Sequence, residues 1–296
     1  MESLDQKGRV PLKNILFATD FSAASEVALP QALKIAGQYG STLYVAHVIC
    51  PELVHFLPAE STVSIVEDAR RLAHQNMEHL LSVASQAGVS CQSLIGEGVI
   101  WDVLQDMIRE NHIDLIVVGT HGRRGLGKLL LGSVAEEVFR LAPCPVLTVG
   151  PKTLAMRSRD VELSHILYPV ESVPDPSAAA AYAVSLAEQY HTRLTFMKVF
   201  ERSVPSPEPQ AGVEEPVRHW MDDHVPMGSD LRKRTCFEPG FGPAAEAILK
   251  FAEDHGVDLI VMGLERLDAV MAAHIPKSTT AYEVVRNASC PVLTVR

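Results

Sequence analysis

The residues best suited to chemistry form one glycine-rich, basic segment in the first half of the chain, residues 119–133. Glycines let a backbone approach a ligand closely, and a helix that starts directly after them offers unpaired N–H groups and a partial positive charge to an anion. An apolar segment of helical period, 134–142, follows at once. The pattern predicts a phosphate cradle, whose glycines and cations are Gly119, Gly122, Gly125, Gly127, Gly132, Arg123, Arg124 and Lys128. A solvated basic loop would explain the cations equally well, so the glycines carry the prediction.

Residues 122–128 also fit the GxxxxGK pattern of a P-loop. Leu129, however, stands where that loop needs a Ser or Thr to hold magnesium, and the segment lies late in its domain instead of opening it. We interpret this match as a coincidence.

The spacing of the other reactive side chains predicts neither a metal site nor a catalytic residue. The five cysteines form no CxxC pair, and the twelve histidines form no HExxH motif or Cys/His cluster. We therefore expect reduced, mostly buried thiols. No nucleophile can be matched by spacing to a base that would activate it.

Composition narrows the class of partner. A net charge of −10 argues against nonspecific nucleic-acid binding, which requires a basic face. The N-terminal residues 1–9 are polar, and no apolar run approaches the roughly 20 residues that a membrane span needs. We expect a cytoplasmic protein with no nucleic-acid or membrane partner.

The sequence contains an internal repeat, which is evident before any secondary structure is assigned. Four blocks recur in the same order: 14–20 as 165–171, 38–43 as 189–194, 114–119 as 258–263, and 144–149 as 290–295. The copies lie 151 residues apart at the first two blocks, 144 at the third and 146 at the fourth, so the second copy is shorter in its middle. This predicts an N-terminal tail (1–11), a first domain (12–150), a linker (151–163) and a second domain (164–296).

Each copy alternates short apolar runs with longer segments of helical period, the pattern of an α/β domain. In the first copy we predict strands near 14–18, 42–48, 91–95, 114–119 and 145–149, and helices near 22–39, 61–87, 98–111 and 132–141. In the second copy, residues 201–230 are rich in proline and predict a loop with at most one short helix. Continuous apolar strands are typical of parallel sheets that are covered on both faces. We predict two doubly wound, Rossmann-like parallel sheets of five strands, each with the strand order 3-2-1-4-5.

Such a sheet binds ligands beyond the carboxyl ends of its strands, where the strand order reverses. In the first copy that crevice lies between strands 1 and 4. Strand 1 ends with Ala18, Thr19 and Asp20, and strand 4 ends with Val118 and Gly119. Asp20 would also serve as a turn residue before a helix capped by Ser22, but its place at the crevice favours a role in binding.

These residues carry a resemblance. The pattern Gly119-x2-Gly122-x9-Gly132-Ser133, with a Pro-Val-Leu strand after its helix, resembles the nucleotide-binding signature of the ATP-binding branch of the universal stress protein family. Residues 18–22 resemble the end of that family's first strand, and with the repeat the likeness covers nearly the whole chain.

The resemblance implies ATP, with Mg2+ as its usual companion, as the ligand of the first domain. It implies that Asp20 and the backbone of Ala18 and Thr19 meet the ribose and the adenine edge, and that Val48, which follows His47, packs against the base. The residues implied around the phosphates and the end of strand 4 are Val118, Gly119, Gly122, Arg123, Gly132, Ser133 and Val134. Ser133 and Glu136 also have the spacing of a capping box, which needs no ligand.

The second copy departs from the signature. Glu171 replaces Asp20, Lys198 replaces His47, and no glycine corresponds to Gly122. The pair Ser278–Thr279 aligns with Gly132–Ser133, so a side chain would fill the volume that a phosphate needs. We predict that the fold is kept, that the cradle is lost, and that one chain binds one ATP.

The resemblance favours a regulatory protein of the stress response, with slow ATP hydrolysis as its only enzymatic possibility. One alternative is a nucleotide-free scaffold or a carrier of an apolar ligand, which would use residues 270–273 and 201–230. Another is an ATP-pyrophosphatase-type enzyme, but that class places a Ser-Gly-Gly-rich loop directly after strand 1. We further expect the last strands of the two copies, 146–149 and 292–295, to meet in an intramolecular pseudo-dimer. The expectation leaves homodimerisation of the whole chain open.

Overall fold

The computed structural model describes residues 10–50, 59–120, 131–151, 153, 163–171, 178–200, 225, 228–264 and 279–296, with residues 59–63 described as backbone only. The chain divides into two compact units. The first unit is Pro11–Val149, and the second is Gly150–Arg296 together with Val10.

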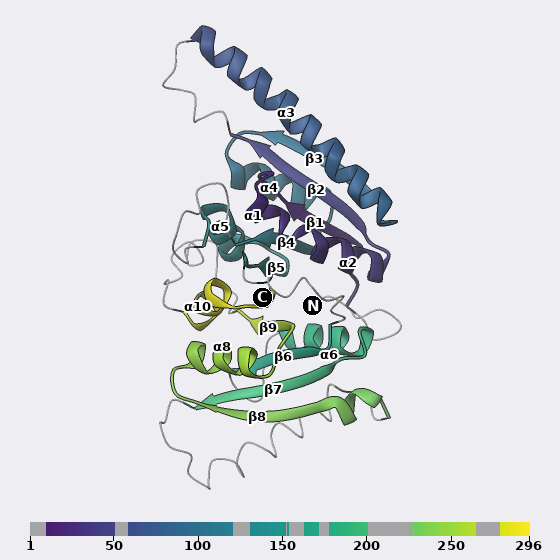
Figure 1. The fold of residues 1–296 in the computed structure, drawn as a ribbon, viewed down its shortest axis with the longest axis vertical. Coiled ribbons are helices and arrows are strands. Elements are labelled where there is room, and N and C mark those ends of the chain that lie inside the picture. The colour runs from purple at the N-terminus through teal and green to yellow at the C-terminus, as the bar shows by residue number, and fades with distance from the viewer. Residues whose placement is uncertain are drawn as a thin grey trace. The chain divides into compact units, whose positions relative to one another are not determined.

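The first unit is built on a parallel sheet of five strands. They are β1 (Asn14–Ala18), β2 (Thr42–Ile49), β3 (Cys91–Glu97), β4 (Leu115–Gly119) and β5 (Val146–Val149). Strand β1 pairs with β2 and β4, β2 pairs with β3, and β4 pairs with β5, so the order is β3-β2-β1-β4-β5 (Figure 1). This confirms the predicted order. Strand β1 is apolar throughout its centre because both faces of the sheet are covered, and Ile15, Leu16 and Phe17 are fully buried.

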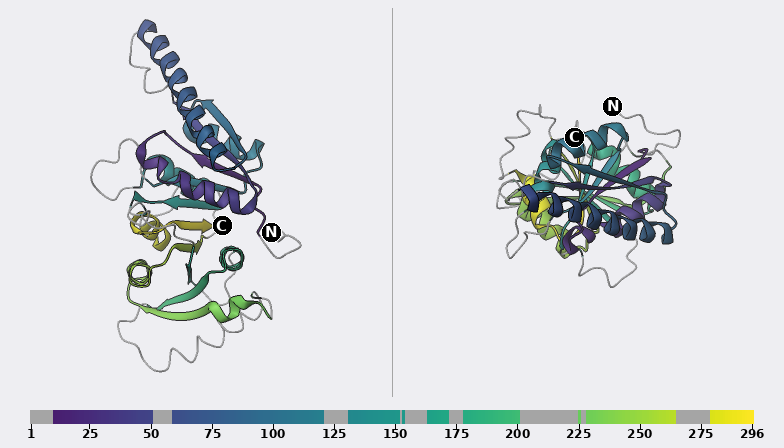
Figure 2. Two further views of the ribbon diagram at one scale, coloured as in Figure 1. Left: turned by 45° about the vertical axis from the view of Figure 1, so that its right-hand side comes forward. Right: turned by 90° about the horizontal axis from the view of Figure 1, so that it is seen from above.

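Helices cover both faces of this sheet (Figure 2). They are α1 (Ala23–Glu26), α2 (Leu29–Tyr39), α3 (Ala59–Gln86), α4 (Ile100–Glu110) and α5 (Ser133–Leu141). The prediction of one helix over 22–39 is wrong, because the structure separates α1 from α2 at residues 27–28. Pro30 stands in the first turn of α2 and has no N–H with which to continue the preceding helix.

The second unit repeats the same sheet. Its strands are β6 (His165–Val170), β7 (Arg193–Phe200), β8 (Thr235–Phe241), β9 (Leu259–Gly263) and β10 (Val292–Val295). Their pairings give the order β8-β7-β6-β9-β10. The described helices are α6 (Ala179–Gln189), α8 (Ala244–Asp254), α10 (Thr280–Asn287) and the 3-10 helix η3 (Asp230–Arg234). Most of the predicted loop at 201–230 lies outside the described residues. No helix within the described ranges is long and apolar enough to cross a membrane.

The two units differ where their central strands end. Strand β1 pairs with β4 over four positions, up to Ala18, whereas β6 pairs with β9 only at Ile166 and Leu167. Pro169 stands in β6 where the first unit has Ala18, and proline has no N–H to donate to a neighbouring strand. The carboxyl ends of the central strands are therefore less fully joined in the second unit.

The second unit contains a buried histidine, His165, at a position where the first unit has Asn14. The Nε2 atom of His165 lies 2.8 Å from Thr195 Oγ1, and its Nδ1 atom lies 2.8 Å from an Arg193 Nη atom. Because arginine only donates, Nδ1 must accept, so the neutral ring carries its proton on Nε2 and donates it to Thr195. Burial, reinforced by the Arg193 charge, lowers the pKa of His165 below its ordinary 6.5, and the His255 carbonyl and the Asp258 carboxylate oppose this shift only in part.

This lowered pKa predicts that the second unit loses stability in mild acid. Below about pH 6.5 the unfolded chain binds a proton on His165 that the folded unit does not yet bind, so the free energy of unfolding should fall as the pH falls toward the folded pKa. Hydrogen exchange of the β6 amides, measured between about pH 7.5 and about pH 5, would report the change.

His165→Asn is the matched variant, because Asn14 occupies the corresponding position and donates from Nδ2 to the Asn111 carbonyl at 3.0 Å. The His255 carbonyl lies in the equivalent place, 3.3 Å from His165 Nδ1. We expect the variant to have a flatter pH dependence than the natural protein. Equal slopes in the two proteins would show that His165 does not cause the effect.

Candidate functional site

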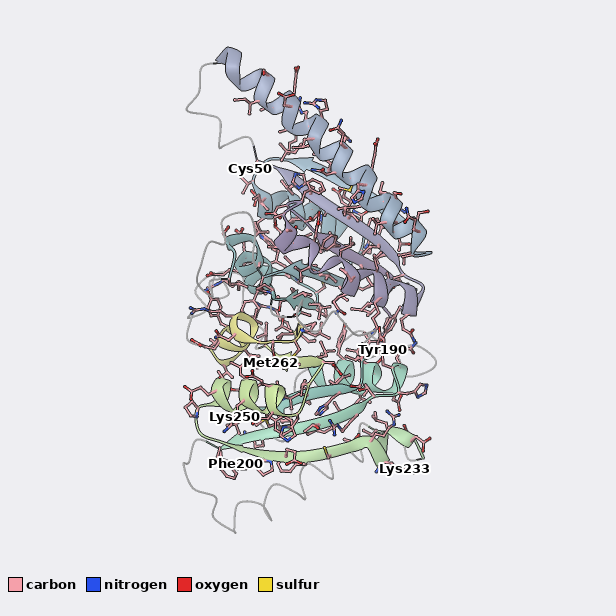
Figure 3. The ribbon with its side chains drawn as sticks, viewed as in Figure 1. Cys50, Tyr190, Phe200, Lys233, Lys250 and Met262 are labelled. Carbon is pink, nitrogen blue, oxygen red and sulfur yellow. The ribbon has the colours of Figure 1, made fainter. Side chains whose placement is uncertain are left out.

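The crevice of the first unit lies where its strand order reverses, at the carboxyl ends of β1 and β4. Figure 3 labels Cys50, which directly follows β2 and marks this end of the sheet. The turn from β1 to α1 lies at this end of the sheet, as does Thr120, which follows β4. Among the described residues, no group of three or more His, Cys, Asp or Glu side chains lies together in a way that could hold a metal ion.

A chain of hydrogen bonds fixes the turn after β1. The Phe21 N–H donates to Thr19 Oγ1 at 2.9 Å, and Thr19 Oγ1 lies 2.9 Å from Ser25 Oγ. Because the one Ser25 hydroxyl proton goes to the Ser22 carbonyl at 2.9 Å, Thr19 must donate to Ser25. Ser22 caps α1 by accepting the Ser25 N–H at 3.2 Å. The hydroxyl protons of Thr19 and Ser25 are thereby assigned.

Asp20 is oriented by the same network. Its Oδ1 accepts the Ser22 N–H at 3.0 Å and the Ser22 hydroxyl at 2.6 Å, and the side chain is partly exposed. Asp20 therefore does make the contacts of a turn residue. These contacts hold its carboxylate at the crevice instead of competing with a binding role.

Gly119, at the end of β4, has a structural reason to be glycine. A Cβ at this position would lie 2.7 Å from the Ala24 carbonyl oxygen and 3.0 Å from Ser25 Cα, both backbone atoms of α1. The close approach of α1 to β4 thus excludes any side chain, whatever the ligand. On the other side of β1, Val48 lies in β2 opposite Gly96 and is partly exposed, while Ala18 and Val118 are buried.

A backbone hydrogen bond joins the residue after β4, Thr120, to the residue before α5, Gly132. The Thr120 N–H donates to the Val149 carbonyl at 2.9 Å, and the Gly132 N–H donates to the Thr120 carbonyl at 2.8 Å. The backbone at 120 is therefore bonded directly to the residue that precedes α5. Six residues of the predicted cradle lie outside the described residues, namely Gly122, Arg123, Arg124, Gly125, Gly127 and Lys128.

No side chain in the described part of the chain caps the start of α5. Gly132 is the N-cap, with φ −62° and ψ 148°, and Ser133 is the first helical residue. A capping box requires the serine at the N-cap, so the alternative of a capping box at Ser133 and Glu136 is wrong. Val134 follows in the same turn, whose N–H groups have no partner within the helix and suit an anion.

The second unit caps the equivalent helix with its own side chain. Thr279 is the N-cap of α10, and its Oγ1 accepts the Tyr282 N–H at 3.3 Å. Sequence alignment placed Thr279 opposite Ser133, but the structure gives it the capping position that Gly132 holds in the first unit. Glu171 is exposed, and Lys198 Nζ donates to its backbone carbonyl. The helix start that is left open in the first unit is closed in the second.

No role was predicted from the sequence for two residues that contact this turn. They are Ser25, which completes the turn network, and His47, which was named only for its place in the sequence and its replacement by Lys198 in the second copy and which contacts the turn from β2. The serines at i and i+3, Ser22 and Ser25, were a signal that could have been used. The contact of His47 joins residues far apart in the sequence and left no local signal.

Proteins with similar sequences are found in archaea and bacteria. A universal stress protein of Methanocaldococcus jannaschii is 32% identical over 150 residues, which cover 50% of this chain and 88% of the relative. The homolog 1 of universal stress protein A from Coxiella burnetii is 34% identical over 147 residues, covering 47% of this chain and 97% of the relative. Among solved structures, a universal stress protein of Archaeoglobus fulgidus shares the fold, with a TM-score of 0.73 at 18% identity over 96% of this chain and 98% of that one.

The model of the universal stress protein family matches this chain twice, at residues 11–150 and at residues 162–296. Together the two matches cover nearly the whole sequence. The chain therefore belongs to the universal stress protein family.

Proposed function

We propose that the first unit binds ATP and that the protein serves a regulatory role in the stress response, with partners responding to the nucleotide-bound state. The observation that carries this proposal is the open start of α5, which faces the crevice without a capping side chain. The first-unit residues also fit the signature of the ATP-binding branch of the family. The proposal includes a cytoplasmic location and domain limits of 12–150 and 164–296, separated by a linker.

The base and ribose would lie over the ends of β1 and β2. The backbone at Ala18 and Thr19 would meet the adenine edge, and Val48 would pack against the base. Asp20, held by its bonds from Ser22, would accept hydrogen bonds from the ribose hydroxyls.

The phosphates would lie at the start of α5. Its first-turn N–H groups, on Ser133, Val134 and the residue after them, would donate to phosphate oxygens, and the helix dipole would add a partial positive charge. Gly122 and Arg123 would close the cradle, and Mg2+ would accompany the triphosphate. Bound ATP supplies an activated phosphate. We propose slow hydrolysis at most, because the site as proposed contains no dedicated base.

A nucleotide-free role is the alternative, and the second unit is the part of the chain that favours it. Thr279 occupies the cap that an anion would need, and Glu171 is exposed. We propose that this unit acts as a scaffold, or binds a small ligand of another class.

Titration tests the asymmetry of the two units. Nucleotide-free protein should bind one equivalent of ATP by calorimetry, because α5 starts without a side-chain cap whereas Thr279 caps the equivalent helix α10 of the second unit. Asp20→Ala should weaken this binding by about 1 to 3 kcal/mol, the value of hydrogen bonds to a charged group. Two equivalents of similar affinity would contradict the loss of the second site.

Substitution at the two helix caps separates binding from folding. Gly132→Val should abolish ATP binding and leave the fold intact, because its φ and ψ are ones that any residue adopts while the branched side chain fills the phosphate space. Thr279→Ala, the control, should lower the unfolding free energy of the second unit by about 1 kcal/mol and leave ATP binding unchanged. Natural affinity in the Gly132→Val protein would exclude α5 as the phosphate site.

We also propose that the two units form an intramolecular pseudo-dimer through β5 and β10. Each is the last strand in the order of its own sheet and would otherwise present unpaired backbone groups. Hydrogen exchange should then find the amides on both sides of β5 protected in the intact chain. Rapid exchange of every second β5 amide would contradict the proposal. Homodimerisation of the whole chain is compatible with this arrangement.

A further inference from the structure

His47 contacts the turn after β1 in two ways. It lies near the carboxyl end of β2, one residue before Val48. Its Nδ1 is 2.9 Å from the Thr19 carbonyl oxygen, and its ring centroid lies 4.3 Å from that of Phe21 with the planes inclined at 37°. One side chain of β2 thus contacts the residues immediately before and after Asp20.

The direction of the hydrogen bond follows from its partner. A carbonyl oxygen only accepts, so His47 Nδ1 must carry a proton and donate it. The neutral Nδ1–H tautomer and the imidazolium ion both meet this requirement.

The turn needs an external hold because its backbone is strained. Phe21 has φ 58°, in the left-handed region that residues bearing a side chain seldom adopt. The hydrogen bonds among Thr19, Ser22 and Ser25 set the shape of the turn but do not attach it to the sheet. It is bonded to β2 by the Thr19 N–H, which donates to the Ala46 carbonyl at 3.0 Å, and by His47.

The second unit has a different contact at the position that corresponds to His47. Lys198 occupies the position of His47 and also donates to a carbonyl at the end of the first strand, but to that of Glu171, one residue further along. Lysine is a flexible chain with a point charge and no ring, and Ser172 replaces Phe21 in the sequence. A tether between the two strands is retained, whereas the rigid aromatic contact is found in the first unit.

We propose that His47 is a positioning residue of the first-unit site: it holds the strained turn so that the Asp20 carboxylate faces the ribose before the nucleotide arrives. The inference rests on the proposed function. A carboxylate that is already in place binds more tightly, because its ordering does not have to be supplied by the ligand.

The test combines substitutions with a change in the ligand. Calorimetry should compare ATP with 2′,3′-dideoxy-ATP, which lacks the ribose hydroxyls. His47→Ala should weaken ATP binding about tenfold, whereas His47→Asn, whose amide nitrogen can occupy the place of Nδ1, should stay within about threefold of the natural protein. The natural protein should lose about tenfold on the change to the dideoxy nucleotide, and His47→Ala should lose little, because its Asp20 is no longer held in place.

Lys198→Ala is the matched control, because it removes the equivalent tether from the second unit and should leave ATP affinity unchanged. If His47→Ala does not fold, His47→Gln takes its place, since it moves the donor away from the Nδ1 position and should show the same loss. A natural protein that does not bind ATP would overturn the proposed function together with this inference. If the natural protein binds ATP but His47→Asn is as weak as His47→Ala, or if the ratio of the two nucleotides is the same in all variants, the inference alone is overturned.

Discussion

The close approach of β4 to α1 at Gly119 is the contact on which the first-unit crevice depends. The Ala24 carbonyl oxygen lies where any side chain at 119 would have to go, so the backbones meet with no space between them. This contact brings Ser25 to Thr19, and the hydroxyls of these two residues then bond across the start of the turn. On the far side of the same strand end, Thr120 bonds to Gly132 and places the start of α5. One glycine thereby positions both the acidic turn and the helix that would receive a phosphate.

The duplication supplies an internal control for separating folding from binding. Features kept in both units serve the fold: the turn after the third strand uses Gly98 in one and Gly242 in the other, at φ 138° and 100°, values that glycine alone adopts easily. Gly119 also has a glycine counterpart in the sequence, Gly263. Two differences lie at the crevice: the first unit has an open cap where the second has a threonine cap, and proline shortens the central pairing of the second unit. Both alter the carboxyl ends of the strands, where a sheet of this order binds ligands, and they therefore support a binding role for the first unit.

Sequence alone predicted the strands and their order because buried parallel strands are continuous apolar runs with few alternatives. It failed where one residue or one tertiary contact decides the outcome. The break between α1 and α2 was hidden by an apolar pattern that continues through Pro30, and the start of α5 was one residue from the place that a capping box would give it. The role of His47 depends on a contact between neighbouring strands, which spacing along the chain cannot reveal, whereas the spacing of Ser22 and Ser25 did hold a local signal for the turn network.

Two histidines show how the partner atom decides the response of a site to acid. Arg193 can only donate to the Nδ1 of His165, so protonation of that ring must break the contact and place two positive charges side by side. The Thr19 carbonyl can only accept from the Nδ1 of His47, so protonation leaves this bond in place. In both cases the neighbour can act only as a donor or only as an acceptor, so it decides whether Nδ1 carries a proton. The lowered pKa of His165 therefore predicts that mild acid acts on the buried network of the second unit, whereas the hydrogen bond that His47 donates in the first unit is compatible with both protonation states of its ring.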